Sequence, residues 1–192
     1  LKQILPNAGF ITEEGTVEQA SDGLNWIIYP LDGTTNFIHD TAPYCVSIAL
    51  SNNDKVLLGV SYEVGRDECC YAWKGGNSFL NNQQIQVSGI TIKDAFIGLD
   101  LPYNTEFKPV VLHALNELYG NTSSIRVNGS VAASLCYVAS GRYDGWGEAF
   151  IKIWDYSAGM LIVREAGGKV TDFNGNDHVT DTHHIIATNG II

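Results

Sequence analysis

Positively charged residues are scarce in this sequence of 192 residues, and long apolar segments are missing. Lys and Arg together number 11 against 21 Asp and Glu, which gives a formal net charge of −10 at pH 7. This balance argues against nucleic acid or an anionic membrane as the main partner, because both attract basic surfaces. No apolar run approaches the roughly 18 residues of a membrane span. With 45% apolar and 17% charged residues, the chain has enough apolar side chains to form a core.

Cysteine and methionine are also rare. The four cysteines include no pair with the C-x-x-C spacing of a zinc site, and the adjacent Cys69 and Cys70 would form a strained disulfide. We therefore expect reduced, mostly buried thiols in a cytoplasmic protein. The first residues lack the basic and apolar pattern of a signal peptide. Because the chain begins at Leu1 and its only methionine is Met160, we expect the native start to lie upstream.

Two different patterns divide the chain near residue 90. Before it, short apolar stretches alternate with turn sequences, which is typical of hairpins in an antiparallel sheet. The first strong strand, residues 25–28, is expected to stop at Pro30, because proline cannot continue a central ladder. From residue 91 strands alternate with helices expected at 109–119, 130–140 and 155–166, which indicates an α/β half. We predict one compact unit with an antiparallel-sheet half, residues 1–90, and an α/β half, residues 91–192.

The most informative segment, residues 26–37, ends a strand and continues into Asp32-Gly33-Thr34. An Asp at a strand end is well placed to hold a hard cation, and Gly33 lets the backbone approach a ligand closely. The N–H groups of Gly33 and Thr34 would then face an anion if a helical turn starts there. The same residues are also good turn formers. This segment alone therefore leaves both a ligand site and a plain turn open.

Acidic residues in two further segments add to this pattern. Glu13-Glu14 lies just upstream, and Asp155 lies far downstream in the sequence Ile153-Trp154-Asp155. Taken singly, Asp155 also suits the N-cap of its helix and Glu13-Glu14 suits a solvated surface. Three acidic segments that could share one hard cation favour a metal site instead.

Together these segments resemble the inositol monophosphatase family, within the wider magnesium-dependent, lithium-sensitive phosphatase superfamily. The family patterns are G-E-E, then W-I-I-D-P-[IL]-D-G-T-T-N-F, then W-D-x-A-[AG]-G, and their order and spacing match here. The resemblance covers essentially all 192 residues, although the family's helical N-terminal portion, which normally precedes G-E-E, is absent. It implies an α+β fold, the layered α/β/α/β/α sandwich of the inositol monophosphatase and fructose-1,6-bisphosphatase type.

The resemblance also implies a site that holds two Mg²⁺ ions. On this basis Glu13 binds the first ion and orients the attacking water, and the backbone carbonyl of Leu31 binds the same ion. Asp32 and Asp155 correspond to ligands of the second ion. Thr34 corresponds to the residue that polarises the water. Two such ions would neutralise the phosphate charge, lower the pKa of a bound water and stabilise the leaving alkoxide.

The implied substrate contacts lie in both halves of the chain. Gly33 and Thr34 correspond to the phosphate-binding turn, in the half that carries the metal and phosphate motifs. Glu148 corresponds to the acid that hydrogen-bonds inositol hydroxyls, in the half that carries Asp155. A substrate-contacting turn at a helix start corresponds to Gly129, Ser130 and Val131. The implied substrate is inositol monophosphate or a related phosphorylated polyol or sugar, and the resemblance makes a homodimer the expected assembly.

Tyr29 departs from the family pattern at the position of the Asp that bridges both metals. A phenol with an ordinary pKa of about 10 carries no charge at pH 7. It is also too long and too rigid to replace a short bridging carboxylate. Three negative charges then remain where the family has four, on Glu13, Asp32 and Asp155. We expect weakened metal binding and turnover lower by at least about 10²-fold.

Two alternatives stay open from the sequence. One lies within the superfamily, with a nucleotide bisphosphate or fructose bisphosphate as substrate. Glu148 argues against it, because a carboxylate accepts hydrogen bonds from hydroxyls and repels a second phosphate. The other is a non-catalytic relative that serves as a binding protein, which Tyr29 supports.

Overall fold

The computed structural model describes residues 1–15, 20, 23–177 and 182–192. A seven-stranded sheet, here sheet A, contains its strands in chain order from β1 to β7. A five-stranded sheet, here sheet B, has the order β11-β12-β10-β8-β9. The strands are β1 (Gly9–Thr12), β2 (Leu24–Asp32), β3 (Cys45–Asn52), β4 (Lys55–Glu63), β5 (Glu68–Trp73), β6 (Ser78–Leu80), β7 (Gln83–Ile85), β8 (Phe96–Leu99), β9 (Ser124–Arg126), β10 (Gly145–Ala149), β11 (Lys169–Thr171) and β12 (His184–Thr188).

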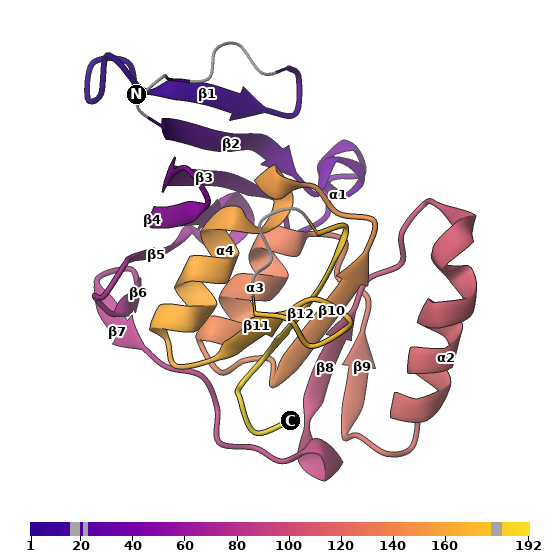
Figure 1. The fold of residues 1–192 in the computed structure, drawn as a ribbon. Coiled ribbons are helices and arrows are strands. Elements are labelled where there is room, and N and C mark those ends of the chain that lie inside the picture. The colour runs from indigo at the N-terminus through magenta and orange to yellow at the C-terminus, as the bar shows by residue number, and fades with distance from the viewer. Residues whose placement is uncertain (16–19, 21–22, 178–181) are drawn as a thin grey trace.

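Helices lie between the two sheets and beside sheet B (Figure 1). The α-helices are α1 (Thr34–Ile38), α2 (Lys108–Leu118), α3 (Val131–Ala139) and α4 (Ile153–Glu165). Single turns of 3-10 helix are η1 (Val64–Arg66), η2 (Ile92–Asp94) and η3 (Thr105–Phe107). Helices α3 and α4 form the central layer, and α2 lies on the far side of sheet B. The layered α+β sandwich is thus confirmed. The described residues supply a β/α/β/α portion of it.

The core lies where α3 and α4 fill the space between the sheets. Leu135 of α3 and Ile162 of α4 are fully buried and join Trp146 of β10 in one cluster of apolar side chains. Both helices are apolar on almost every side, as expected for helices covered on two faces. Their N-termini therefore have fixed positions relative to both sheets. This matters because the candidate site is built around those N-termini.

The predicted end of the first strand at Pro30 is wrong, because β2 continues to Asp32. Tyr29 pairs with Ser47 and Asp32 pairs with Cys45, so β2 has one more residue than β3 between these pairs. This bulge takes Pro30 out of the ladder with β3. The pairing with β1 ends at Ile28, so the missing N–H of the exposed Pro30 disrupts no hydrogen bond on that side either.

The predicted antiparallel sheet of the first half is confirmed from β2 to β7 and has a parallel pair at its edge. β1 runs parallel to β2, with Gly9 beside Asn25 and Thr12 beside Ile28, while the pairs from β2 to β7 are antiparallel. Because the two strands are parallel, β2 begins at the same end of the sheet as β1. As a result, Glu13 follows the end of β1 on the side of the sheet where β2 approaches Asp32.

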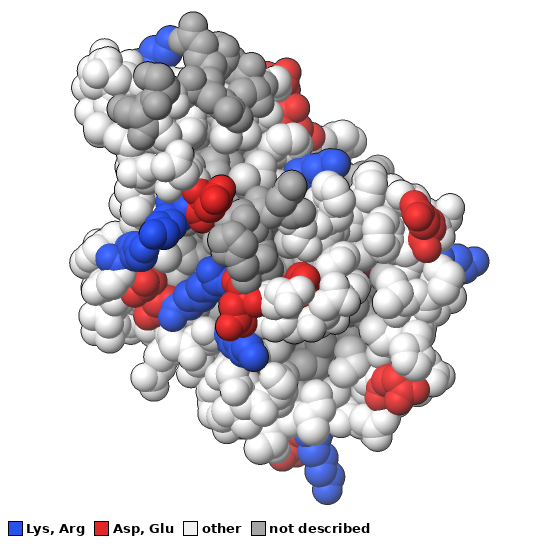
Figure 2. Space-filling model, in the orientation of Figure 1, with Lys and Arg blue, Asp and Glu red and all other residues white. Residues whose placement is uncertain are grey.

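Acidic and basic side chains are interspersed on the visible face of the molecule (Figure 2). On the face shown in Figure 2, basic side chains lie among acidic ones, and neither sign covers the face without interruption. Within the described part of the chain, every helix is too short or too polar to cross a membrane.

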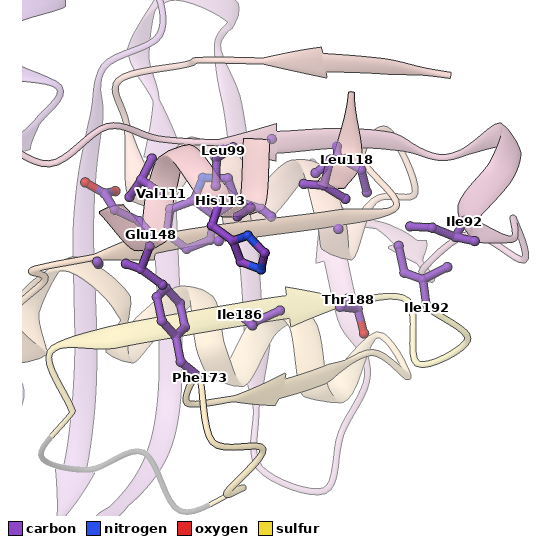
Figure 3. Close-up of a pocket in the computed structure, with 18 residues that line it drawn as sticks. Ile92, Leu99, Val111, His113, Leu118, Glu148, Phe173, Ile186, Thr188 and Ile192 are labelled. Carbon is purple, nitrogen blue, oxygen red and sulfur yellow. The ribbon is translucent and has the colours of Figure 1, made fainter. Parts of the chain in front are cut away.

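A cavity of about 390 Å³ separates α2 from sheet B. Figure 3 shows Val111, His113 and Leu118 of α2 across from Ile186 and Thr188 of β12, with Glu148 at one end. Its walls are almost entirely apolar. The cavity lies beside the candidate site and shares Glu148 with it.

Candidate active site

The candidate site begins where β2 ends. Gly33 follows Asp32 with φ 82° and ψ 37°, a left-handed conformation that favours glycine, and α1 starts at Thr34. The hydroxyl of Thr34 donates to the carbonyl of Leu31 at 3.1 Å, which closes the turn. A side chain at Gly33 would also lie 2.8 Å from the carbonyl oxygen of Pro43. The turn therefore requires glycine for both its backbone angles and its close contacts.

Asp32 is buried, with 3% of its surface exposed, and it binds the start of α3. Its Oδ2 accepts from the hydroxyl of Ser130 at 2.5 Å and from the backbone N–H of Ala132 at 2.8 Å. Burial raises the pKa of Asp32 to about 6, against the opposing effect of the Ser130 hydrogen bond. Both of these hydrogen bonds end on Oδ2 and fix the carboxylate at the start of α3.

Asp155 occupies the first turn of α4, three residues after the N-cap position, which is Lys152. The alternative reading of Asp155 as the N-cap residue itself is therefore excluded, because Asp155 is the third residue of the first turn. Its Oδ2 accepts from the backbone N–H of Lys152 at 2.5 Å, as the third residue of a capping box does. Burial, together with the charges of Asp32 and Glu13, raises the pKa of Asp155 to about 7, against the opposing effect of the hydrogen bond from Lys152.

Tyr29 lies among the acidic residues that the sequence predicts for the site. Burial raises the pKa of its phenol well above the ordinary value, and the carboxylates of Asp32, Asp155, Glu13 and Glu148 add to the shift. These four groups come from four separate segments of the chain, and all act on the same phenol. Tyr29 is therefore neutral at pH 7 and adds no charge at the point where the carboxylates converge.

Glu13 and Glu148 come from the two different halves of the chain. Glu13 is exposed and follows β1 directly. Glu148 is a partly buried residue of β10 in sheet B. Burial raises the pKa of Glu148 to about 9, and the charges of Asp100, Asp32 and Asp155 contribute. Burial is the main cause of the raised pKa values of Asp32, Asp155 and Glu148, and neighbouring carboxylates add to each shift. A bound cation would oppose these shifts by favouring the ionised carboxylates.

The turn before α3 lies against the turn after β2. Gly129 has φ 73° and is exposed, and a side chain at Gly33 would lie 3.4 Å from the carbonyl oxygen of Gly129. The side-chain amide of Asn36 donates to the carbonyl of Asn128 at 3.0 Å and to that of Pro43 at 2.8 Å. Val131 begins α3 and is buried. The structure thus places the predicted phosphate turn beside the predicted substrate turn.

Asp100 and Asn36 belong to this arrangement, although the sequence motifs do not identify them as site residues. Asp100 is buried and accepts hydrogen bonds from the backbone N–H groups of Asn128 and Gly129. A signal for it was available. Asp100 directly follows the apolar strand β8, just as Asp32 ends β2, and an Asp at a strand end was the feature that pointed to Asp32.

Comparison with known proteins decides which family has this arrangement. The model of the inositol monophosphatase family matches residues 1–191. The chain belongs to this family. An inositol-1-monophosphatase of Mesorhizobium japonicum is 38% identical over 195 residues, which cover all of this chain and 73% of that protein. A protein of Pasteurella multocida named Nus factor SuhB is 36% identical, with 97% of this chain and 71% of that protein covered.

Solved structures of the family have the same fold. The crystal structure of the extragenic suppressor protein suhB from Bartonella henselae has a TM-score of 0.93 at 37% identity, covering 99% of this chain and 74% of that chain. Inositol monophosphatase from Anabaena (Nostoc) has a TM-score of 0.93 at 34% identity, covering 100% and 77%. The relatives therefore include proteins named as phosphatases and proteins named as Nus factors.

The donor set suits one divalent cation better than the two that the family resemblance implies. In the described ranges, no three His, Cys, Asp or Glu side chains are grouped so that they could hold one metal ion. Magnesium, however, is commonly bound through one or two carboxylates, with waters and substrate phosphate completing its six ligands. Asp32 and Asp155 would supply those carboxylates. Tyr29 supplies no charge that a second ion would need.

Proposed function

We propose that this chain hydrolyses phosphate monoesters of inositol or a related polyol in a Mg²⁺-dependent reaction, at a rate reduced by Tyr29. The observation that carries the proposal is that four carboxylates from separate segments lie near enough to Tyr29 to raise the pKa of its phenol. The four are Asp32, Asp155, Glu13 and Glu148. Asp32, Asp155 and Glu148 have raised pKa values themselves, and the charge of Glu13 adds to the shift of Asp155. Such an acidic cluster costs stability unless a cation binds there.

Each residue has a defined part in this proposal. Asp32 and Asp155 would hold Mg²⁺, which offsets the phosphate charge and acidifies a bound water. The backbone N–H groups of Gly33 and Thr34 would bind phosphate oxygens. Glu13, exposed at the edge of the site, would orient the attacking water. Glu148 would bind a polyol hydroxyl, from the other sheet.

A second candidate is a protein of this fold that binds a ligand or partner without catalysis. Two observations favour it. Tyr29 removes one of the four charges of the family's metal site, and several relatives are named as Nus factors rather than as phosphatases. The two candidates differ in one measurable property, which is release of phosphate.

The test measures phosphate release from inositol 1-phosphate by the intact chain, with and without Mg²⁺. We expect slow hydrolysis that requires Mg²⁺ and disappears in Asp155→Asn, because that change removes a metal ligand. Asp172→Asn is the matched control, since Asp172 is a partly exposed aspartate whose carboxylate accepts hydrogen bonds from Asn174 and Asn176 of its own turn. The control should retain full activity.

The outcomes separate the candidates. Binding of inositol 1-phosphate without hydrolysis would favour the non-catalytic protein. Faster hydrolysis of fructose 1,6-bisphosphate or a nucleotide bisphosphate would mean that the chain is a phosphatase with a different class of substrate. Absence of both binding and hydrolysis would contradict the proposed polyol-phosphate site altogether.

A further inference from the structure

A buried carboxylate outside the family motifs, Asp100, holds the turn that precedes α3. Only 3% of its surface is exposed. Its Oδ1 accepts from the backbone N–H of Asn128 at 2.7 Å and of Gly129 at 2.8 Å. Its Oδ2 accepts from the indole Nε1 of Trp146 at 2.8 Å and from the hydroxyl of Ser134 at 3.5 Å. In the described part of the chain no Lys or Arg pairs with Asp100, so neutral donors hold this buried group.

The segment 128–132 is thereby held from both sheets. Asp100, after β8 of sheet B, binds Asn128 and Gly129, while Asp32, at the end of β2 of sheet A, binds Ser130 and Ala132. The donors of this segment thus go to two different carboxylates, those of Asn128 and Gly129 to Asp100 and those of Ser130 and Ala132 to Asp32. Neither carboxylate alone fixes the whole segment.

The position of this segment sets the distance between the two candidate ligand turns. The carbonyl oxygen of Gly129 lies close to Gly33, and Asn36 joins the carbonyl of Asn128 to that of Pro43. A shift of Asn128 and Gly129 would therefore move the substrate turn relative to the phosphate turn. Small shifts of this kind weaken ligand binding without unfolding a protein.

Trp146 links Asp100 to the strand that carries Glu148. The two residues lie two positions apart on β10, so their side chains leave the strand on the same side. Trp146 is 1% exposed, and its ring packs in the main core. Its N–H thus connects the strand that carries Glu148 to the carboxylate that holds the turn.

We propose that Asp100 and Trp146 are a positioning pair for ligand binding. Asp100 holds the backbone of Asn128 and Gly129, and Trp146 holds Asp100, so that the turn before α3, the Gly33 turn and Glu148 keep their relative positions. Neither residue touches the ligand. The identity of the ligand, a phosphorylated polyol, rests on the proposed function. The positioning itself rests on the hydrogen bonds described above.

The first test replaces Asp100 by Asn and measures inositol 1-phosphate hydrolysis. An amide has one acceptor oxygen, so its NH₂ group must face either the N–H of Trp146 or the backbone N–H groups of the turn. We expect KM to rise by about tenfold, the equivalent of one lost hydrogen bond to a charged group, with kcat changed by less than about threefold. Trp146→Phe should also raise KM, since it leaves Oδ2 without its indole donor.

The double variant tests whether the two residues act together. With Trp146→Phe, the amide of Asp100→Asn no longer faces a competing donor, so the double variant should have a lower KM than Asp100→Asn alone. If the two substitutions acted independently, their separate effects on KM would multiply instead. Asp144→Asn is the matched control, because Asp144 is also buried and accepts from the backbone N–H of Phe96 at 2.6 Å, at the opposite end of β8. It should lower Tm and leave KM unchanged.

Amide signals in two-dimensional NMR spectra separate this inference from the proposed function. In the ligand-free protein, Asp100→Asn should move the signals of Asn128, Gly129 and Gly33, whereas Asp144→Asn should not. If these signals move but the chain hydrolyses no phosphate ester, the positioning pair stands and the phosphatase proposal fails. Unmoved signals, or an unchanged KM in Asp100→Asn with only a lower Tm, would overturn the positioning role.

Discussion

Tyr29 adds volume and a hydroxyl, but no charge, where Glu13, Asp32, Asp155 and Glu148 converge. Burial and these charges all raise the pKa of the phenol, so ionisation cannot restore the missing charge near neutral pH. Burial and neighbouring charges also raise the pKa values of three surrounding carboxylates. The pKa is raised to about 6 for Asp32, about 7 for Asp155 and about 9 for Glu148.

These raised pKa values predict how stability depends on pH without metal. Each folded-state pKa exceeds the ordinary value near 4, so between these values the folded protein binds more protons than the unfolded chain. The associated stability is present at low pH and lost as pH rises through about 6 to 9. We therefore expect Tm to fall between pH 6 and pH 8 in the presence of a chelator.

Calorimetry across this range, on the protein and on Asp155→Asn, checks the prediction. The variant removes one of the titrating groups and should show a weaker decline of Tm with pH. A Tm that rises from pH 6 to pH 8 would contradict the assigned direction of the shifts.

At the scale of elements, the site depends on where β2 ends and where α3 begins. Apolar patterning predicted the three long helices to within a few residues, because apolar periodicity marks the buried faces of helices and glycine marks their ends. It did not predict the bulge that lets β2 pass Pro30, since that depends on the partner strands on both sides. Asp100 was missed for a related reason. Its partners Asn128 and Trp146 are distant in sequence and meet only in the fold.

The packing of α3 between the sheets gives an element-scale prediction. Leu135 is fully buried in the central cluster of apolar side chains. Leu135→Ala should lower the free energy of unfolding by about 2–5 kcal/mol, through lost burial and the cavity left behind. Leu112→Ala is the control, because Leu112 on α2 is 50% exposed. Denaturant unfolding of both should show a change below about 0.5 kcal/mol for the control. Equal losses would contradict the assignment of the core to α3.

At the scale of the whole molecule, two sheets and a central helical layer bring four acidic segments to one place. Sheet A brings Glu13 and Asp32, α4 brings Asp155, and sheet B brings Glu148. Three motifs were enough to predict the family, because their order and spacing are specific, and the family comparison confirms it. The ligand roles of these residues remain predictions. The number of metal ions is where this chain should differ most from its family.

The measurement that tests the account most directly is a calorimetric Mg²⁺ titration of the unaltered chain and of Tyr29→Asp, with Tyr29→Phe as control. Two dications about 4 Å apart repel each other by roughly 16 kcal/mol at an effective dielectric constant of 20, so a second ion needs a shared negative charge. We predict at most one bound Mg²⁺ at millimolar metal for the unaltered chain and for Tyr29→Phe. Tyr29→Asp should bind two and hydrolyse inositol 1-phosphate at least about 10²-fold faster. Two bound ions in the unaltered chain, with turnover equal to that of Tyr29→Asp, would contradict the account.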